Sequence, residues 1–163
     1  MPSKMTNFGK FAIVDSGVKI DVDLSRFNKQ YQKAQYGLDG DVMTSMIPFM
    51  PMQSGIFVDV TRAASAAMQG TGKVYAAYGP AGQFLYKGKT MVSEVTGSTW
   101  ARLGERKVLV SQYSGQTKAK EDLSYSKTTH PEAQAYWFDA AKSRDISTWV
   151  KNVKKNAGGG KRG

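Results

Sequence analysis

Cysteine is absent from this 163-residue chain, and histidine occurs only once. Without thiols the chain has no disulfide framework and no thiolate zinc site, and one histidine among scattered carboxylates lacks the ligand spacing of a metal centre. No apolar run reaches the roughly 18 residues that a membrane-spanning helix needs, and the first fifteen residues lack the apolar core of a secretory signal. We therefore expect no membrane partner and no export by a signal peptide.

Positive charge is what the chain has in excess. Lys and Arg number 23 against 13 Asp and Glu, so the net charge is +10 and the isoelectric point is near 9.7. Residues 151–163 contain five basic side chains and no acidic one. A surplus of this size favours an anionic partner, either nucleic acid or an acidic protein surface. The candidate contacts are Lys151, Lys154, Lys155, Lys161 and Arg162.

The N-terminal third shows both kinds of periodicity. Alternating aliphatic residues predict strands over 11–14 and 18–22. Apolar residues three and four apart then predict a helix over 24–34, which the glycines and aspartates at 37–40 interrupt. A second apolar turn follows over 43–49.

The middle of the chain is interpreted as mainly β. Alternation predicts strands over 56–61 and 73–78, and a short apolar helix over 83–86 follows a Gly-Pro turn. Residues 90–95 and 107–112 also alternate and predict a long hairpin.

The C-terminal part predicts two helices. Pro131 suits the first turn of a helix over 131–142, with Thr128 or Thr129 as its cap. A second helix is expected over 146–155, and a flexible, basic, Gly-rich tail at 157–163. The fold class is α+β: an N-terminal helix, an antiparallel or mixed sheet with a long hairpin, and two C-terminal helices packed on the sheet. Residues 1–156 are expected to form one domain.

Two apolar groups are candidates for contact with a neighbouring subunit. The methionine-rich segment is interpreted either as core filler or as an adaptable surface that another subunit buries. The turn of the predicted hairpin carries a tryptophan among charged residues, a combination that anchors and orients interfaces. The candidate interface residues are Met46, Phe49 and Met50 in the first group and Trp100, Arg102 and Arg106 in the second.

Catalytic, cofactor and metal sites are not expected. His130 precedes a proline, where a capping or packing role is the usual one. The segment Lys87-Gly88-Lys89-Thr90 resembles the end of a phosphate-binding loop, but Gln83 stands where that loop needs glycine. A turn that presents two lysines is the preferred interpretation.

Three blocks of sequence resemble the minor capsid proteins of tailed phages of Gram-positive hosts, a family similar to the head–tail joining proteins of long-tailed phages. The first is IPFMPMQSGI at 47–56, with Ser54 where threonine is usual. The second is 74–92, where Ala81-Gly82 replaces an expected Tyr-Ala. The third and most specific comprises Leu123, Tyr125, His130, Pro131, Ala133, Trp137, Phe138, Ala141, Lys142 and Trp149.

The resemblance implies a non-enzymatic virion protein that is made in the cytoplasm of the host bacterium. It implies a ring of six or twelve copies at the neck, in contact with head-closure or connector proteins and with the tail terminator or tail tube. Non-specific contact with DNA in the channel is a further expectation. Two alternatives stay open: a tail completion or terminator protein at the top of the tail, and a basic nucleic-acid-binding protein outside the virion.

Overall fold

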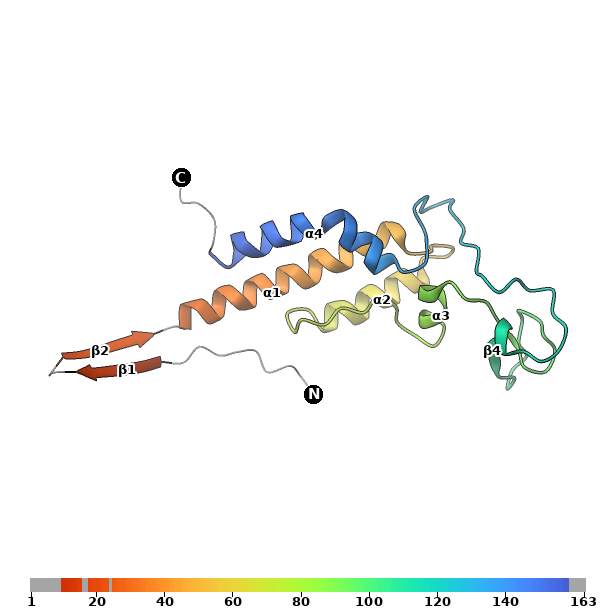
Figure 1. Cartoon of the computed structure of the whole chain (residues 1–163), viewed down its shortest axis with the longest axis horizontal. Helices are drawn as coiled ribbons and strands as arrows, with labels where there is room; N and C mark the ends of the chain where they lie inside the picture. The colour runs from red at the N-terminus through yellow and green to blue at the C-terminus, as the bar shows by residue number, and fades with distance from the viewer. Residues whose placement is uncertain (1–9, 16–17, 24, 159–163) are drawn as a thin grey trace.

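The computed structural model describes residues 10–15, 18–23 and 25–158, and it has the predicted α+β class. The molecule is elongated, with three longer helices side by side and a small β-hairpin at each end (Figure 1). The strands are β1 (Lys10–Asp15), β2 (Val18–Asp23), β3 (Met91–Ser93) and β4 (Lys107–Leu109). The helices are α1 (Ser25–Met46), α2 (Ile56–Ala67), α3 (Gly82–Lys87) and α4 (Trp137–Asn156), with short 3-10 turns η1 (Ile47–Phe49) and η2 (Val110–Gln112). Among the described residues no helix is both long and apolar enough to cross a membrane.

The two hairpins confirm four predicted strands. Strand β1 pairs antiparallel with β2, with Phe11 opposite Val22 and Ile13 opposite Ile20. Strand β3 pairs antiparallel with β4, with Val92 opposite Val108. The second hairpin is shorter than predicted, because the chain leaves the extended conformation after Ser93.

Helix α1 is continuous, so the predicted interruption at 37–40 is wrong. Gly37 and Gly40 are points of close approach: a Cβ added to them would lie 3.0 Å from Asn156 Nδ2 and 2.8 Å from Gln69 Nε2, respectively. Asp39 is buried, and its carboxylate accepts hydrogen bonds from Gln35 Nε2 at 2.7 Å and from the backbone N–H of Gly70, also at 2.7 Å. Tertiary contacts therefore override the weak helix propensity of these residues.

The strand predicted over 56–61 is also wrong, because this segment forms α2. Its alternation is real, but Ile56 is 67% exposed and Val60 is 43% exposed. The residues that α2 buries are Val58, Thr61 and Ser65, which are three and four positions apart, as on one face of a helix. The short aliphatic run therefore belongs to a helix that shows some of its apolar residues to solvent.

Residues 73–78 do not form the predicted strand either. The backbone N–H of Tyr75 donates to Ser65 Oγ at 3.1 Å, and that of Tyr78 donates to Thr61 Oγ1 at 3.2 Å. Hydroxyl groups of α2, rather than a neighbouring strand, thus accept the hydrogen bonds of these backbone N–H groups.

One C-terminal helix replaces the two that were predicted. Pro131 lies in a turn, and α4 begins six residues later at Trp137. It packs antiparallel on α1 rather than on a sheet: Trp149 Nε1 donates to Ser45 Oγ at 3.0 Å, and Asn152 Nδ2 donates to Asp41 Oδ2 at 2.9 Å. The helix continues through residues 143–145, where the Ser143 hydroxyl donates to the Asp139 carbonyl at 2.9 Å and so finds a partner within the helix.

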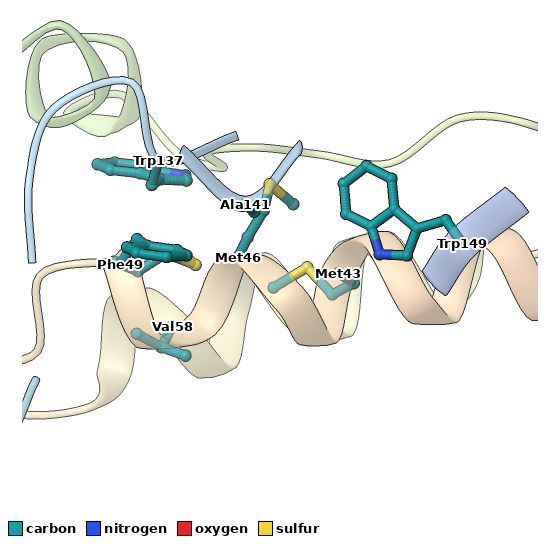
Figure 2. Close-up of a cluster of buried hydrophobic side chains, with 8 residues drawn as sticks. Met43, Met46, Phe49, Val58, Trp137, Ala141 and Trp149 are labelled. Atoms are coloured by element: carbon teal, nitrogen blue, oxygen red, sulfur yellow. The ribbon is translucent and has the colours of Figure 1, made fainter. Parts of the chain in front are cut away.

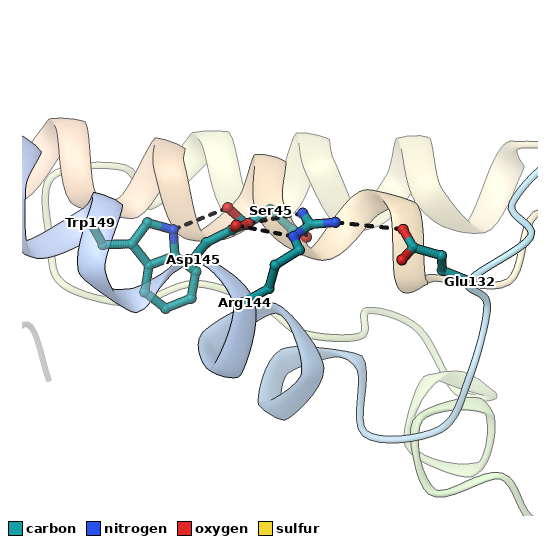
Figure 3. Close-up of polar contacts among 5 residues, drawn as sticks. All are labelled: Ser45, Glu132, Arg144, Asp145 and Trp149. Carbon is teal, nitrogen blue, oxygen red and sulfur yellow. Dashed lines mark hydrogen bonds and ion pairs between the residues drawn. The ribbon is translucent and has the colours of Figure 1, made fainter.

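Charged groups reinforce the α1–α4 contact near the start of α4 (Figure 3). The Arg144 guanidinium lies 4.6 Å from the centre of the Phe49 ring, 2.8 Å from an Asp145 carboxylate oxygen and 3.5 Å from a Glu132 carboxylate oxygen. The hydrogen bond from Arg144, followed by one from Ser45, lowers the pKa of Asp145. The pair is therefore fully ionised at neutral pH.

The core lies where α1, α2 and the first turns of α4 meet (Figure 2). Trp137 is fully buried, and its indole N–H donates to the Ala76 carbonyl at 2.7 Å. Its ring makes edge-to-face contacts with Phe57 and Tyr86, with ring centres 5.9 and 4.9 Å apart. The buried cluster comprises Met43, Met46, Phe49, Met50, Val58, Trp137, Ala141 and Trp149.

Met46, Phe49 and Met50 are consequently not the subunit surface that was one of the two interpretations of this segment. They are 1%, 5% and 0% exposed within the single chain. Their apolar area is already buried against α2 and α4, so a neighbour could reach it only by opening the core.

Truncation of Trp137 tests this description of the core. We expect Trp137→Ala to lower the free energy of unfolding by about 3–5 kcal/mol, the usual cost of removing a buried aromatic side chain. Trp100→Ala is the matched control, because that indole is 85% exposed. Its effect should stay within about 0.5 kcal/mol. Urea unfolding followed by circular dichroism measures both, and equal effects would contradict the assignment of Trp137 to the core.

Candidate functional site

The end of the molecule beyond α3 is a loop-rich unit, residues 89–123, which we call the arm (Figure 1). Lys89 closes its base, with Nζ 2.8 Å from Asp122 and 3.3 Å from Glu121. The backbone N–H of Leu123 also donates to the Gly88 carbonyl at 2.8 Å. Gly88 ends α3 in the left-handed conformation, so the segment that resembles a phosphate-binding loop forms a turn at the base of the arm.

Ser93 is the central polar group of the arm. Its hydroxyl is fully buried, donates to Glu105 Oε2 at 2.6 Å and accepts the backbone N–H groups of Val95 and Thr96 at 3.2 Å each. Glu105 Oε2 also accepts the backbone N–H of Arg102 at 3.0 Å. These bonds tie both ends of the 94–106 loop to β3.

Ionised Glu105 is the form that holds this loop. The hydrogen bond from Ser93, followed by that from the Arg102 backbone, lowers the pKa of Glu105 below its ordinary 4.5. A carboxylate with a depressed folded-state pKa stabilises above its ordinary pKa. That contribution disappears as the pH falls through the lower folded-state value, so the loop is held throughout the neutral range.

A tyrosine ring between two glycines forms the inner packing of the arm. A Cβ added to Gly97 would lie 2.5 Å from Tyr113 Cε1, and one added to Gly115 would lie 2.8 Å from Tyr113 Cζ. Thr117 Oγ1 donates to the Gly97 carbonyl at 2.6 Å and so brings the second loop of the arm to the first. The arm is thus ordered from within, without a large sheet.

Large apolar side chains project from this ordered arm. Trp100 is 85% exposed, Val95 is 71% exposed, and Leu103 is fully exposed. Arg102 and Arg106 are exposed in the same loop, as the sequence predicted for the turn of the hairpin. The same loop and residues 116–119 line an open hollow of about 460 Å³, to which the loop contributes residues 96–99. Apolar anchors beside a polar rim are the usual anatomy of a protein–protein interface.

The segment between the arm and α4 docks the arm on the helical body. The Tyr125 hydroxyl donates to the Leu85 carbonyl at the end of α3. His130 Nδ1 lies 2.7 Å from the Met50 carbonyl, to which it donates, and Ala133 is buried. Tyr125, His130 and Ala133 belong to the third family-like block, together with core residues Trp137, Ala141 and Trp149. Tyr125 and His130 bond this segment to the helical body, and Trp137, Ala141 and Trp149 pack α4 into the core.

The predicted basic contacts lie at the other end of the molecule. Lys151, Lys154 and Lys155 are exposed on the last turns of α4. Lys161 and Arg162 fall outside the described residues. Within the described part of the chain, no three His, Asp or Glu side chains gather as a metal site would require.

Ser93, Asp39 and Tyr113 were missed by the sequence analysis. Each acts through partners distant in the chain: Ser93 binds Glu105, Asp39 binds Gly70, and Tyr113 packs on Gly97. The only local signals were the glycines, which punctuate loops but do not say which ring lies against them.

Comparison of this chain with protein-family models, curated proteins and solved structures finds no match.

Replacement of Glu105 tests whether the arm is held as described. We expect Glu105→Ala to make the 94–106 loop several-fold more susceptible to trypsin at Arg102 and Arg106, because the Ser93 hydroxyl and the Arg102 N–H lose their shared acceptor. Glu94→Ala removes the same charge from an exposed position of the same loop and should leave cleavage unchanged. Peptide mapping of timed digests measures both, and identical time courses would rule out the anchoring role.

Proposed function

We propose that this chain is a structural protein of a tailed-phage virion, which forms a ring of identical subunits at the neck between the head and the tail. Support comes from the three family-like blocks of sequence and from the arm. The partners in this proposal are further copies of the chain, the head-closure or connector proteins, and the tail terminator or tail tube.

The observation that carries the proposal is the pair of exposed apolar side chains, Trp100 and Leu103, on an internally bonded loop at one end of an elongated body. A flexible loop would have to become ordered on binding, and the entropic cost would offset much of its binding energy. The Ser93–Glu105 hydrogen bonds have already ordered this one, so Trp100 can act as an anchor in a partner's pocket.

The distribution of elements suits head-to-tail assembly. The β1–β2 hairpin and the arm lie at opposite ends of the molecule (Figure 1). A contact between unlike ends of neighbouring subunits is heterologous, and it closes into a ring when the rotation per subunit divides a full turn. A two-stranded hairpin is marginal alone and offers two strand edges, to which an extended segment of a neighbour can add.

The third family-like block contributes indirectly. Tyr125 and His130 fix the connection between the arm, which carries Trp100, and the helical body. In this proposal they position the docking surface and do not touch the partner.

The abundance of the chain in particles tests the proposal. We would quantify it by mass spectrometry in gradient-purified virions of the phage that encodes it, with the portal protein as internal standard. A copy number equal to that of the portal protein supports a twelvefold neck ring, and half that number supports a sixfold ring. Enrichment with free tails rather than heads would place the chain at the top of the tail, and absence from virions would refute the proposal.

Trp100→Ala, introduced into the same genome, tests the arm. We expect the variant protein to fold and accumulate normally, but infectious particles to fall by at least about tenfold, in line with the loss of an interface anchor worth 2 kcal/mol or more. Filled heads and free tails should accumulate, as counted by electron microscopy. Tyr78→Ala removes another exposed aromatic ring, away from the arm, and should leave the titre unchanged. A wild-type titre for Trp100→Ala would remove the arm from the proposal.

A further inference from the structure

The end of the helical body opposite the arm carries a concentration of positive charge that two helices build together. Helix α1 contributes Arg26, Lys29 and Lys33, and has no acidic residue before Asp39. Helix α4 contributes Lys151 and Lys155, and has no acidic residue after Asp145. All five basic side chains are exposed, and none of them forms an ion pair with any described residue.

Contacts between the helices bring these two segments together. A Cβ added to Gly37 of α1 would lie 3.0 Å from Asn156 Nδ2, and one added to Gly158, just beyond α4, would lie 3.3 Å from Gln30 Nε2. The start of α1 therefore runs beside the end of α4, as the antiparallel pair in Figure 1 shows. The basic residues of both helices consequently lie at the same end of the pair.

The three basic residues of α1 form one stripe. Arg26, Lys29 and Lys33 are three and four positions apart, the spacing of neighbours on a helix surface. Together with Gln30 they line one open hollow of about 390 Å³. Because Gln30 contacts the segment after α4, this stripe runs along the edge of the α1–α4 contact.

The two lysines of α4 lie on the same side of the helix pair as the α1 stripe. Lys151 and Lys155 are four apart, and Lys155 lies about a sixth of a turn from the contact position Asn152, whose amide binds Asp41. Lys33 is offset by a similar angle, in the same rotational sense, from Gln30 and Gly37, the residues of α1 that contact the end of α4. In antiparallel right-handed helices, offsets of the same sign bring side chains to the same side of the pair. We call this surface, made by Arg26, Lys29, Lys33, Lys151 and Lys155, the basic face.

The basic face differs from the other end of the same helix pair. There Arg144 is matched by Glu132 and Asp145, so its charge is compensated within the chain (Figure 3). Among the described residues, the five cations of the basic face lie without ion pairs at the opposite end of the helix pair from Arg144. Polar Gln30 lines the hollow together with the three cations of α1, in contrast to the apolar anchors of the arm.

We propose that the basic face binds the sugar–phosphate backbone of double-stranded DNA without reading its sequence. Five cations on two rigid helices, whose axes lie about 8–10 Å apart, fit a regular polyanion that carries one charge per roughly 1.7 Å of its axis. Release of condensed counterions drives such binding. An acidic protein patch, in contrast, is usually recognised through an apolar anchor as well, and no aliphatic or aromatic residue is among those that line the hollow of this face (Ser25, Arg26, Lys29, Gln30 and Lys33).

This inference stands apart from the proposed function. It is tested on the isolated full-length protein, so DNA binding can be present or absent whatever the copy number in virions proves to be.

Salt dependence of DNA binding is the decisive measurement. With a 30-base-pair duplex of arbitrary sequence and fluorescence anisotropy, five phosphate contacts predict a slope of log K against log salt of about −4.5, which is a loss of about 500-fold between 50 and 200 mM salt. Lys151→Gln/Lys155→Gln should reduce the magnitude of the slope by about 2, and Arg26→Gln/Lys29→Gln/Lys33→Gln by about 3.

Matched controls separate the basic face from net charge. Lys142→Gln/Lys154→Gln removes two charges from other flanks of α4, and Lys118→Gln/Lys120→Gln/Lys127→Gln removes three from the arm and the segment that follows it. Both should keep the wild-type slope. Thermal unfolding verifies that each variant is folded, and if the α1 variant is not, the α4 pair decides.

Two results would overturn the inference. One is a loss of slope in the controls equal to that in the matching face variants, which would assign binding to overall charge. The other is tighter binding to poly-glutamate than to duplex DNA at the same salt, with the same sensitivity to the face variants, which would assign the face to an acidic protein.

Discussion

The placement of Trp137 is the constraint on which the rest of the structure depends. Its indole touches Phe57 of α2 and Tyr86 of α3, and its N–H binds the carbonyl of Ala76 between them. The preceding residue, Tyr136, is held at φ 51°, a conformation that costs a non-glycine residue about 1 kcal/mol or more. A backbone hydrogen bond from Tyr136 to the Tyr86 carbonyl at 2.8 Å offsets that cost and turns the incoming loop into α4. From this fixed start α4 runs back along α1 and the arm is led away from the body, so one buried ring sets the direction of both.

Helices and strands were predicted correctly where the hydrophobic period of a segment matched the conformation that it has in the folded chain. The strands of the first hairpin and the short helix α3 both followed from local pattern. It failed at Ile56–Val60, where three aliphatic residues at alternate positions imitate a strand but the buried set is Val58, Thr61 and Ser65. Two of those three side chains are hydroxyls that bind the backbone of residues 75 and 78, a role that no hydrophobicity pattern reveals. The same limit hid the continuity of α1, because the acceptor role of Asp39 depends on Gly70, thirty-one residues away.

The features of the candidate sites also differ in whether the sequence alone could predict them. Exposure of Trp100 in a charged turn, and of the lysines at the end of α4, could be predicted because both depend on composition near one point of the chain. The order of the arm could not, because it comes from a serine, a glutamate and a tyrosine whose partners are found only after folding. Nor could the contribution of α1 to the basic face, since the charges of residues 26–33 meet those of residues 151–155 only through the antiparallel packing of the two helices. The methionine segment shows the converse: a composition typical of adaptable interfaces serves the core when a tryptophan lies against it.

Charge placement along the α1–α4 pair argues that its two ends are built for different tasks. Near the arm, the Arg144 guanidinium contacts Glu132, Asp145 and the Phe49 ring of η1, and it donates to the Ser45 carbonyl of α1 at 3.4 Å. At the far end, four like-charged pairs on the same helices, 26 with 29, 29 with 33, 151 with 154, and 151 with 155, stay uncompensated by any described residue. Each such pair destabilises a helix by about 0.2–0.5 kcal/mol, so together they cost on the order of 1 kcal/mol. That is a noticeable share of the 5–15 kcal/mol by which domains of this size are typically stable. Glutamate at position 26 or 29, in the first turns of α1, would remove part of this cost and would also suit the helix dipole, and an anionic partner would remove the cost in the assembled state.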